Sequence, residues 1–238
     1  MYTAFFLDGQ QGRLFCTGVV HEIAARRQFL ILPPFAEEMN KSRHILSAMV
    51  RALGNAGHDV LLPDLYGTGD SEGDFGSASI DVWRDDALML IEQLGKKGRV
   101  GLIGLRSGAL LAAAIASRRP VDSLTLIHPV ADGRQQLNQL LRLRLAGGLT
   151  DGGKRESAAE LRQRLADGQS LEVAGYWLSP QMASGLESLA LAEQQVSDIG
   201  CINWIELVTS VERPLMPASL RIIDQWQRAD GRIKSETV

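Results

Sequence analysis

The feature that most constrains the fold is the regular alternation of short apolar runs with amphipathic segments over the first 130 residues. Each run is nearly all apolar, as a strand buried on both faces is, and each amphipathic segment has helical spacing. The runs are 28–32, 59–63, 99–105 and 123–129, and the amphipathic segments are 42–55, 80–94 and 107–118. A turn signal at 8–12 also predicts an antiparallel hairpin between 5–7 and 13–20. These patterns predict an α/β fold with a mostly parallel sheet flanked by helices.

The pattern changes between residues 133 and 200, where the sequence shows helical patterns and no convincing strand. Three helical apolar stripes are expected there, at 137–145, 161–171 and 186–196. Strand and helix patterns return at 201–208, 217–229 and 232–238. We therefore expect a single domain over 1–238, in which 133–200 is a helical cap inserted after the sixth strand. An insertion of this kind usually covers the ligand crevice.

The composition excludes several classes of protein. Hydrophobic residues make up 45% of the chain, enough for a buried core, and the net charge of −3 argues against a nucleic-acid partner, which needs a basic surface. Cys16 and Cys201 lie far apart in apolar runs and are interpreted as reduced core residues. Without a Cys/His cluster or a cofactor motif, we expect no metal and no cofactor. No apolar run is long enough for a membrane span, and the start lacks a basic leader, so a cytoplasmic location is expected.

Segments at the carboxyl ends of the expected parallel strands form the candidate ligand site, because open α/β sheets bind ligands at that edge. The most informative segment runs from Gly104 to Gly108. A strand that ends in small-x-nucleophile-x-small and enters a helix is a nucleophile elbow, whose small residues let strand and helix approach each other. The two glycines flank Arg106 at positions −2 and +2, so Arg106 takes the nucleophile position. Placing Ser107 there would put the bulky Leu105 in a small position.

Three features resemble the α/β-hydrolase fold: the Gly-flanked turn at Arg106, the Asp-x-x-Gly-x-Gly-x-Ser loop at 64–71, and the insertion after the sixth strand. The strings at 32–43, 104–106 and 174–176 are similar to exosortase A system-associated hydrolase 2, a bacterial family found with exopolysaccharide and PEP-CTERM sorting systems. The resemblance covers nearly the whole chain. It implies the α/β-hydrolase fold and hydrolysis of an acyl, ester or thioester bond, and it suggests the accompanying hydrolase 1 family as a partner.

The chain departs from a Ser-His-Asp hydrolase at two points. Arg106 stands at the nucleophile position, and in that fold the chain order is Ser, then acid, then His near the end. The four histidines are His21, His44, His58 and His128, and none follows residue 128. Because a serine hydroxyl without a base is a poor nucleophile, ordinary triad catalysis is not supported. The chain stops within an expected strand at Val238, so a longer natural chain stays an open alternative.

The catalytic candidates are Ser107 and Glu212, and each has a structural alternative. Ser107 is either an off-frame nucleophile or the start of a helix, where it satisfies a backbone N–H. Glu212 follows the seventh strand, where the catalytic acid usually lies, or it is a solvated loop residue. The backbone N–H of Phe35 or Ala36 would form an oxyanion hole with that of Ser107.

Charged candidates for substrate binding lie at the same edge of the sheet. Arg106 either anchors a carboxylate or phosphate at a helix N-terminus, or forms a structural ion pair with Glu37, Glu38 or Asp70. Glu38 either begins the next helix or neutralises Arg106. Asp70 is expected to pair with a basic residue near the pocket.

Two hypotheses about function remain open. The first is an enzyme that hydrolyses an acyl, ester or thioester bond, favoured by the fold and the resemblance. The second is a non-catalytic relative that binds an anionic ligand, a partner hydrolase or a second copy of itself, favoured by Arg106 and the missing histidine. The contacts of Arg106 help to choose between these possibilities. An acidic side chain paired with Arg106 favours the non-catalytic hypothesis, and an Arg106 without such a partner, open to the crevice, indicates a site for a carboxylate or phosphate ligand.

Overall fold

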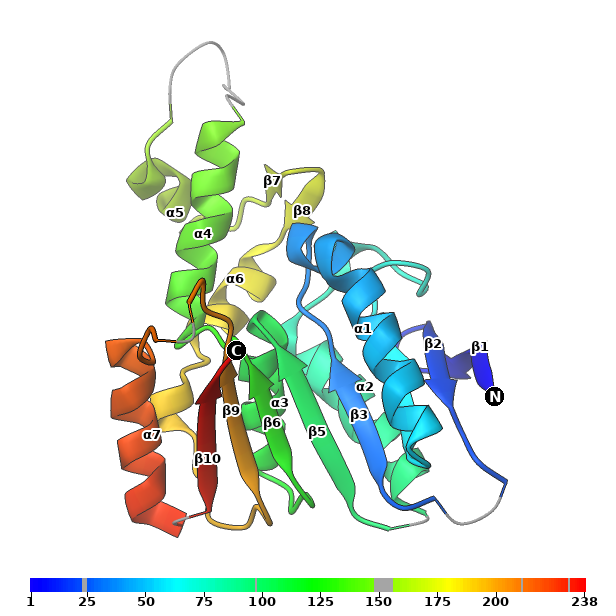
Figure 1. Cartoon of the computed structure of the whole chain (residues 1–238). Coiled ribbons are helices and arrows are strands. Elements are labelled where there is room, and N and C mark those ends of the chain that lie inside the picture. The colour runs from blue at the N-terminus through cyan, green and yellow to red at the C-terminus, as the bar shows by residue number, and fades with distance from the viewer. Residues whose placement is uncertain (23–24, 97, 148–155, 211, 231) are drawn as a thin grey trace.

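The computed structural model describes residues 1–22, 25–96, 98–147, 156–210, 212–230 and 232–238. Its main sheet has eight strands in the order β1-β2-β4-β3-β5-β6-β9-β10 (Figure 1). The strands are β1 (Tyr2–Asp8), β2 (Arg13–Val19), β3 (Gln28–Leu32), β4 (Asp59–Pro63), β5 (Val100–Leu105), β6 (Leu124–Ile127), β9 (Ile202–Glu206) and β10 (Ile233–Thr237). β2 is antiparallel to both of its neighbours, and the other neighbouring pairs are parallel. The predicted hairpin and the mostly parallel sheet are confirmed.

Helices cover both faces of this sheet (Figure 1). α1 (Glu37–Asn55) lies on one face, over β2 and β4, and α2 (Ile80–Gly95) and α3 (Ser107–Ala116) lie on the other. α7 (Pro217–Asp230) contacts β10 and places Trp226 edge-on against Trp204 of β9, with ring centroids 5.9 Å apart. Two short 3-10 helices, η1 (Phe75–Ser77) and η2 (Leu191–Glu193), lie in connections. None of the described helices is both long enough and apolar enough to cross a bilayer.

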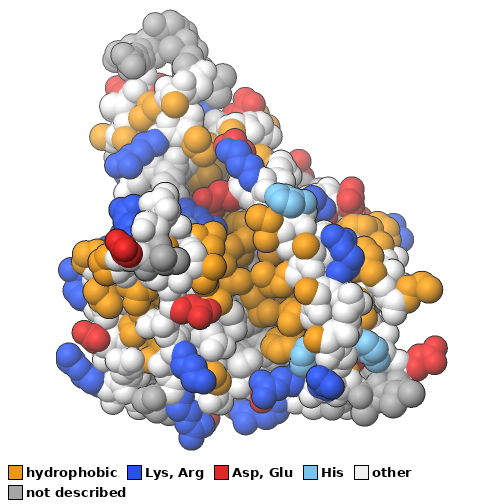
Figure 2. Space-filling view, viewed as in Figure 1, with side chains coloured by type: hydrophobic (Ala, Val, Ile, Leu, Met, Phe, Trp, Pro, Cys, Tyr) orange, Lys and Arg blue, Asp and Glu red, His pale blue; other side chains and the backbone are white. Residues whose placement is uncertain are grey.

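The core is larger on the α2 and α3 face than on the α1 face. The larger cluster extends from the sheet into the segment between β6 and β9. The smaller cluster joins α1 to the sheet, and the neighbouring Ile127 and Ile205 are only half-buried. Figure 2 shows apolar side chains gathered on this side of the molecule, where α1 does not cover the strands.

The segment between β6 and β9 stands above the carboxyl ends of the parallel strands (Figure 1). It contains α4 (Gly133–Ala146), α5 (Ala158–Ala166) and α6 (Pro180–Glu187). It also contains a small antiparallel sheet of β7 (Leu171–Val173) and β8 (Tyr176–Leu178). The expectation that 133–200 holds only helices was therefore wrong.

The physical reason for this hairpin lies in its turn. Ala174 and Gly175 have φ values of 49° and 86°, and two successive positive φ values are what a two-residue type I′ turn requires. Leu171 accordingly belongs to a strand, in which it and Val173 are buried. The third predicted helical stripe, 186–196, belongs to α6 only at its start: α6 ends at Glu187, Ala190 forms a β-bridge with Asp132, and η2 follows.

A buried carboxylate fixes the turn between β1 and β2 to α2. Asp86 of α2 is fully buried, and its Oδ1 accepts a hydrogen bond of 2.9 Å from the backbone N–H of Gln10. Its Oδ2 has no hydrogen-bond donor among the described residues. Burial raises the pKa of Asp86, while the Gln10 hydrogen bond lowers it. Burial, with help from Asp64 and Asp86, also raises the pKa of the free thiol of Cys16 to about 12, which keeps it protonated as a core residue.

We predict that Asp86→Asn stabilises the protein at pH 8, by about 1 kcal/mol, because the amide keeps an acceptor for Gln10 and removes a buried charge. The raised folded-state pKa means that the wild type gains stability as the pH falls through that value, whereas the variant does not. The difference between the two proteins should therefore shrink from pH 8 to pH 4 in urea unfolding. Glu92→Gln, an exposed change on the same helix, is the control. A difference independent of pH would contradict the assignment.

Candidate functional site

Arg106 occupies the tight turn between β5 and α3. Its φ of 53° and ψ of −118° are uncommon for a residue with a side chain. The flanking glycines allow this turn: a Cβ on Gly104 would lie 2.5 Å from Ala109 Cα, and a Cβ on Gly108 would lie 2.2 Å from Leu32 O. The strained residue at this turn is therefore Arg106, as the spacing of the two glycines predicts, and Ser107 is the first residue of α3.

The side chain of Arg106 forms an ion pair with Glu38 at the start of α1. Its Nη2 and Nε donate to Glu38 Oε1 at 3.0 and 3.2 Å, and its Nη1 donates to the backbone oxygen of His128 at 3.3 Å. The two side chains are 24% and 31% exposed. The guanidinium is thus directed at groups of the protein itself, and its charge is balanced within the site.

This ion pair lies on one wall of a crevice with a volume of about 450 Å³. The wall formed by α1 and the two turns consists of Phe35, Glu37, Glu38, Lys41 and Arg106, and the opposite wall consists of Gln136, Gln139, Leu140, Arg142, Leu143 and Ala146 of α4. Lys41 pairs with Glu37 at 2.8 Å. The crevice therefore combines paired charges on the α1 wall, the exposed Arg142 on the α4 wall, and apolar side chains from both walls.

The two residues predicted for the oxyanion hole lie immediately before α1. Phe35 and Ala36 are both buried, and Ala36 has a φ of 55° and a ψ of −136°. The Phe35 ring packs against Trp83 with a centroid distance of 5.2 Å, and it lines the crevice. Both residues lie beside Arg106 at the carboxyl edge of the sheet, as expected. That their N–H groups form an oxyanion hole stays a prediction.

The two predicted catalytic residues do not line this crevice. Ser107 is 3% exposed, and its Oγ has no hydrogen-bond partner among the described residues. Glu212 is exposed in the connection between β9 and α7. The structure therefore does not bring these two residues together with Arg106 and Glu38 in one cavity wall.

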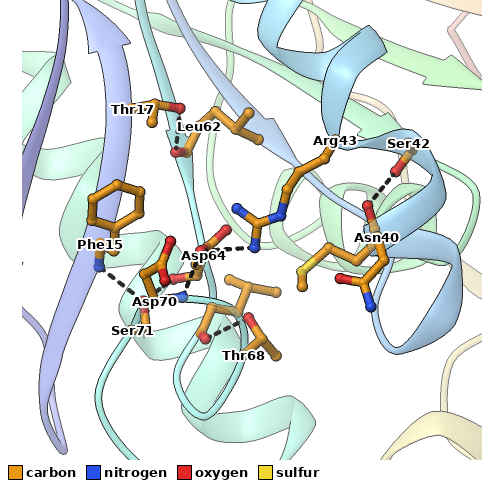
Figure 3. Close-up of polar contacts among 12 residues, drawn as sticks. Phe15, Thr17, Asn40, Ser42, Arg43, Leu62, Asp64, Thr68, Asp70 and Ser71 are labelled. Atoms are coloured by element: carbon orange, nitrogen blue, oxygen red, sulfur yellow. Dashed lines mark hydrogen bonds and ion pairs between the residues drawn. The ribbon is translucent and has the colours of Figure 1, made fainter. Parts of the chain in front are cut away.

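The loop from Asp64 to Ser71 is held by hydrogen bonds within the loop and to α1 and β2 (Figure 3). Asp64 Oδ2 accepts from Arg43 Nη2 at 3.0 Å and from the backbone N–H of Asp70 at 2.9 Å. Ser71 Oγ donates to the Asp64 backbone oxygen at 2.6 Å and accepts from the Phe15 N–H at 2.8 Å. The side chain of Asp70 is exposed and lies outside the crevice lining, so the acidic partner of Arg106 is Glu38 and not Asp70.

Two further residues at this edge were not selected from the sequence as site residues. His128 follows β6 with a φ of 44°, and its Nδ1 accepts from the backbone N–H of Leu207 at 3.2 Å. Burial, followed by the nearby Arg106, lowers the pKa of His128. The imidazole is then neutral at neutral pH, and because Nδ1 is an acceptor, its proton lies on Nε2. In this state Nε2 carries a proton that it can donate, and it cannot act as a base.

Glu206 is the buried acid at the end of β9. It is 1% exposed, and its carboxylate accepts from the backbone N–H of Met216 at 2.9 Å and from Trp204 Nε1 at 3.3 Å. The sequence signal was the alternation in β9, which places Ile202, Trp204 and Glu206 on the same buried face. Its hydrogen bonds hold the connection to α7 against the sheet.

Comparison with known proteins identifies the fold. No family model matches the chain. The bovine (Bos taurus) palmitoyl-protein thioesterase ABHD10, mitochondrial, is 29% identical over 114 residues, which are 47% of this chain and 36% of that protein. The match thus spans about a third of the length of the relative. Mouse alpha/beta hydrolase domain-containing protein 10 superposes with a TM-score of 0.67 at 15% identity, over 99% of this chain and 88% of that one.

A second solved structure gives the same result. Est1E from Butyrivibrio proteoclasticus, with ferulic acid bound, superposes with a TM-score of 0.66 at 17% identity, over 99% of this chain and 89% of that one. At these identities the likeness shows the fold. The chain therefore has the α/β-hydrolase fold, as its sequence resemblance implied.

We predict that Arg106→Gly unfolds at higher urea concentration than Arg106→Leu. Both variants lose the ion pair with Glu38, but only glycine adopts the φ of 53° without strain, which is a difference of about 1–3 kcal/mol. The matched control is His44, an exposed residue of α1, where His44→Gly should be less stable than His44→Leu because glycine weakens a helix. Equal stability of the two Arg106 variants would show that the turn is unstrained.

Proposed function

We propose that this chain binds an acyl compound in the crevice between α1 and α4, and that it does so without Ser-His-Asp catalysis. The observation that supports this most is the ion pair between Arg106 and Glu38 at the turn where a hydrolase of this fold has its nucleophile. A guanidinium held by a carboxylate cannot attack an ester or thioester carbonyl. The site is then a binding site built on a hydrolase fold.

The apolar part of the crevice supports an acyl ligand. Phe35 on one wall faces Leu140, Leu143 and Ala146 of α4 on the other, within about 450 Å³. Small-molecule sites of 300–1,000 Å³ are usually apolar, with a few polar groups that orient the ligand. The name of the bovine relative, a thioesterase for palmitoyl-proteins, also points to acyl compounds as the substrate class.

The burial of Ser107 and the protonation of His128 argue against ester hydrolysis. Glu38 lies beside the N–H groups expected to form an oxyanion hole, but its ion pair with Arg106 offsets the repulsion that its carboxylate would exert on an oxyanion. Ser107 is buried outside the crevice lining. The neutral His128, with its proton on Nε2, is not placed to accept the proton of a serine.

Hydrolysis of an ester or thioester bond through Ser107 is the second candidate. It is favoured by the hydrolase fold and by the Ser107 Oγ, which has no hydrogen-bond partner among the described residues and is free to bind a base. The association with bacterial exosortase and exopolysaccharide systems is proposed from the sequence resemblance alone. From the sequence we also propose a partner hydrolase or a second copy as the binding partner, an anionic ligand as an alternative ligand, and a cytoplasmic location.

We predict that Leu143→Asp weakens binding of a fluorescent fatty acid, dansyl-undecanoic acid, at least tenfold, because it places a charge in the apolar wall of the crevice. Leu143 is 42% exposed, so the fold should tolerate the change. Leu220→Asp on α7, at a residue 43% exposed and outside the crevice, is the matched control and should bind as the wild type does.

The same protein should not react with a fluorophosphonate probe under conditions that label a serine hydrolase completely. Stoichiometric labelling that is lost in Ser107→Ala would establish the second candidate in place of the first. Equal probe binding by the wild type and Leu143→Asp would show that the acyl ligand does not enter this crevice.

A further inference from the structure

We infer that the inner part of the crevice recognises a hydrogen-bond donor on the ligand, such as an amide N–H or a hydroxyl attached to the acyl chain, in preference to a carboxylate. This inference rests on the proposed acyl-binding function and names the polar group that the ligand carries. It follows from two acceptors that the protein leaves without donors on opposite walls of the crevice.

The first acceptor is Glu38 on the α1 wall. Its Oε1 takes both hydrogen bonds from Arg106, through Nε and Nη2, whereas Oε2 is buried and has no donor among the described residues. The remaining bond that Arg106 makes, through Nη1, goes to the backbone oxygen of His128. Arg106 therefore balances the charge of Glu38 without satisfying its second oxygen.

The second acceptor is Gln136 on the α4 wall. This residue lines the crevice and is only 2% exposed, and its Oε1 has no donor among the described residues. An amide N–H or a hydroxyl on the ligand can donate to this oxygen.

A buried acceptor without a donor is unfavourable, and a ligand that donates hydrogen bonds to these two oxygens would remove that cost. A carboxylate has no hydrogen to donate. Two cations of the lining, Arg106 and Lys41, already pair with Glu38 and Glu37. The third, Arg142 of α4, is exposed, and an ion pair at an exposed site contributes little. In the inner part of the crevice an anionic head group would therefore meet unpaired oxygens and a neutralised Arg106, whereas a donor meets the acceptors it needs.

Three eight-carbon probes that differ only in the polar group test this inference by calorimetry: octanamide, methyl octanoate and octanoate. We expect octanamide to bind about tenfold more tightly than methyl octanoate, which has no donor, and octanoate to bind no better than the ester. In Gln136→Leu the advantage of octanamide over methyl octanoate should fall to less than threefold. Gln135→Leu, at an exposed residue of α4 outside the crevice lining, is the control and should keep the advantage.

Glu38→Gln gives a second variant that does not depend on how Gln136→Leu folds. It replaces a carboxylate oxygen by a donor, so affinity for octanoate should rise relative to octanamide. Equal affinities of octanamide and methyl octanoate for the wild type, or tightest binding of octanoate, would overturn this inference and leave the acyl-binding function intact. No binding of any of the three probes would overturn both.

Discussion

The ion pair between Arg106 and Glu38 is the interaction on which the site depends. It connects the turn after β5 to the start of α1, two elements that lie 68 residues apart in sequence, and a third bond ties the same guanidinium to the residue after β6. Three loops at the carboxyl edge of the sheet are thereby held together by one side chain. The same pair fills the position from which a nucleophile would act, so the contact that organises this edge also argues against serine chemistry there.

Much of the fold could be predicted from the sequence because its determinants are local. Apolar runs and helical spacing placed the parallel strands and their helices, and the glycines two residues either side of Arg106 placed the strained turn. The β7–β8 hairpin was missed because its strands have three residues each, too few for an alternating pattern to stand out. Its one signal was Ala174-Gly175, in which Ala takes a positive φ that its side chain does not favour.

The site was less predictable because it depends on which loops meet. The sequence limited the acidic partner of Arg106 to three residues, and only the path of α1 and of the 64–71 loop decides among them. The backbone N–H of Asp70 is bound by Asp64, and its side chain is exposed outside the crevice lining. The wall supplied by α4, including the buried Gln136, depends on how the inserted segment packs onto the sheet, and the sequence showed only that such a segment exists.

The most direct test of this account is a double-mutant cycle on the ion pair, with Arg106→Met, Glu38→Met and the double variant measured by urea unfolding. Methionine matches the glutamate side chain in length, keeps most of the aliphatic part of the arginine side chain, and removes the charge of each. We expect each single variant to be destabilised and the double variant to recover part of the loss, with a coupling free energy of about 1 kcal/mol, because both side chains are largely buried. A coupling free energy near zero would show that Arg106 and Glu38 act independently and would contradict the assignment of the pair as the organising contact of the site.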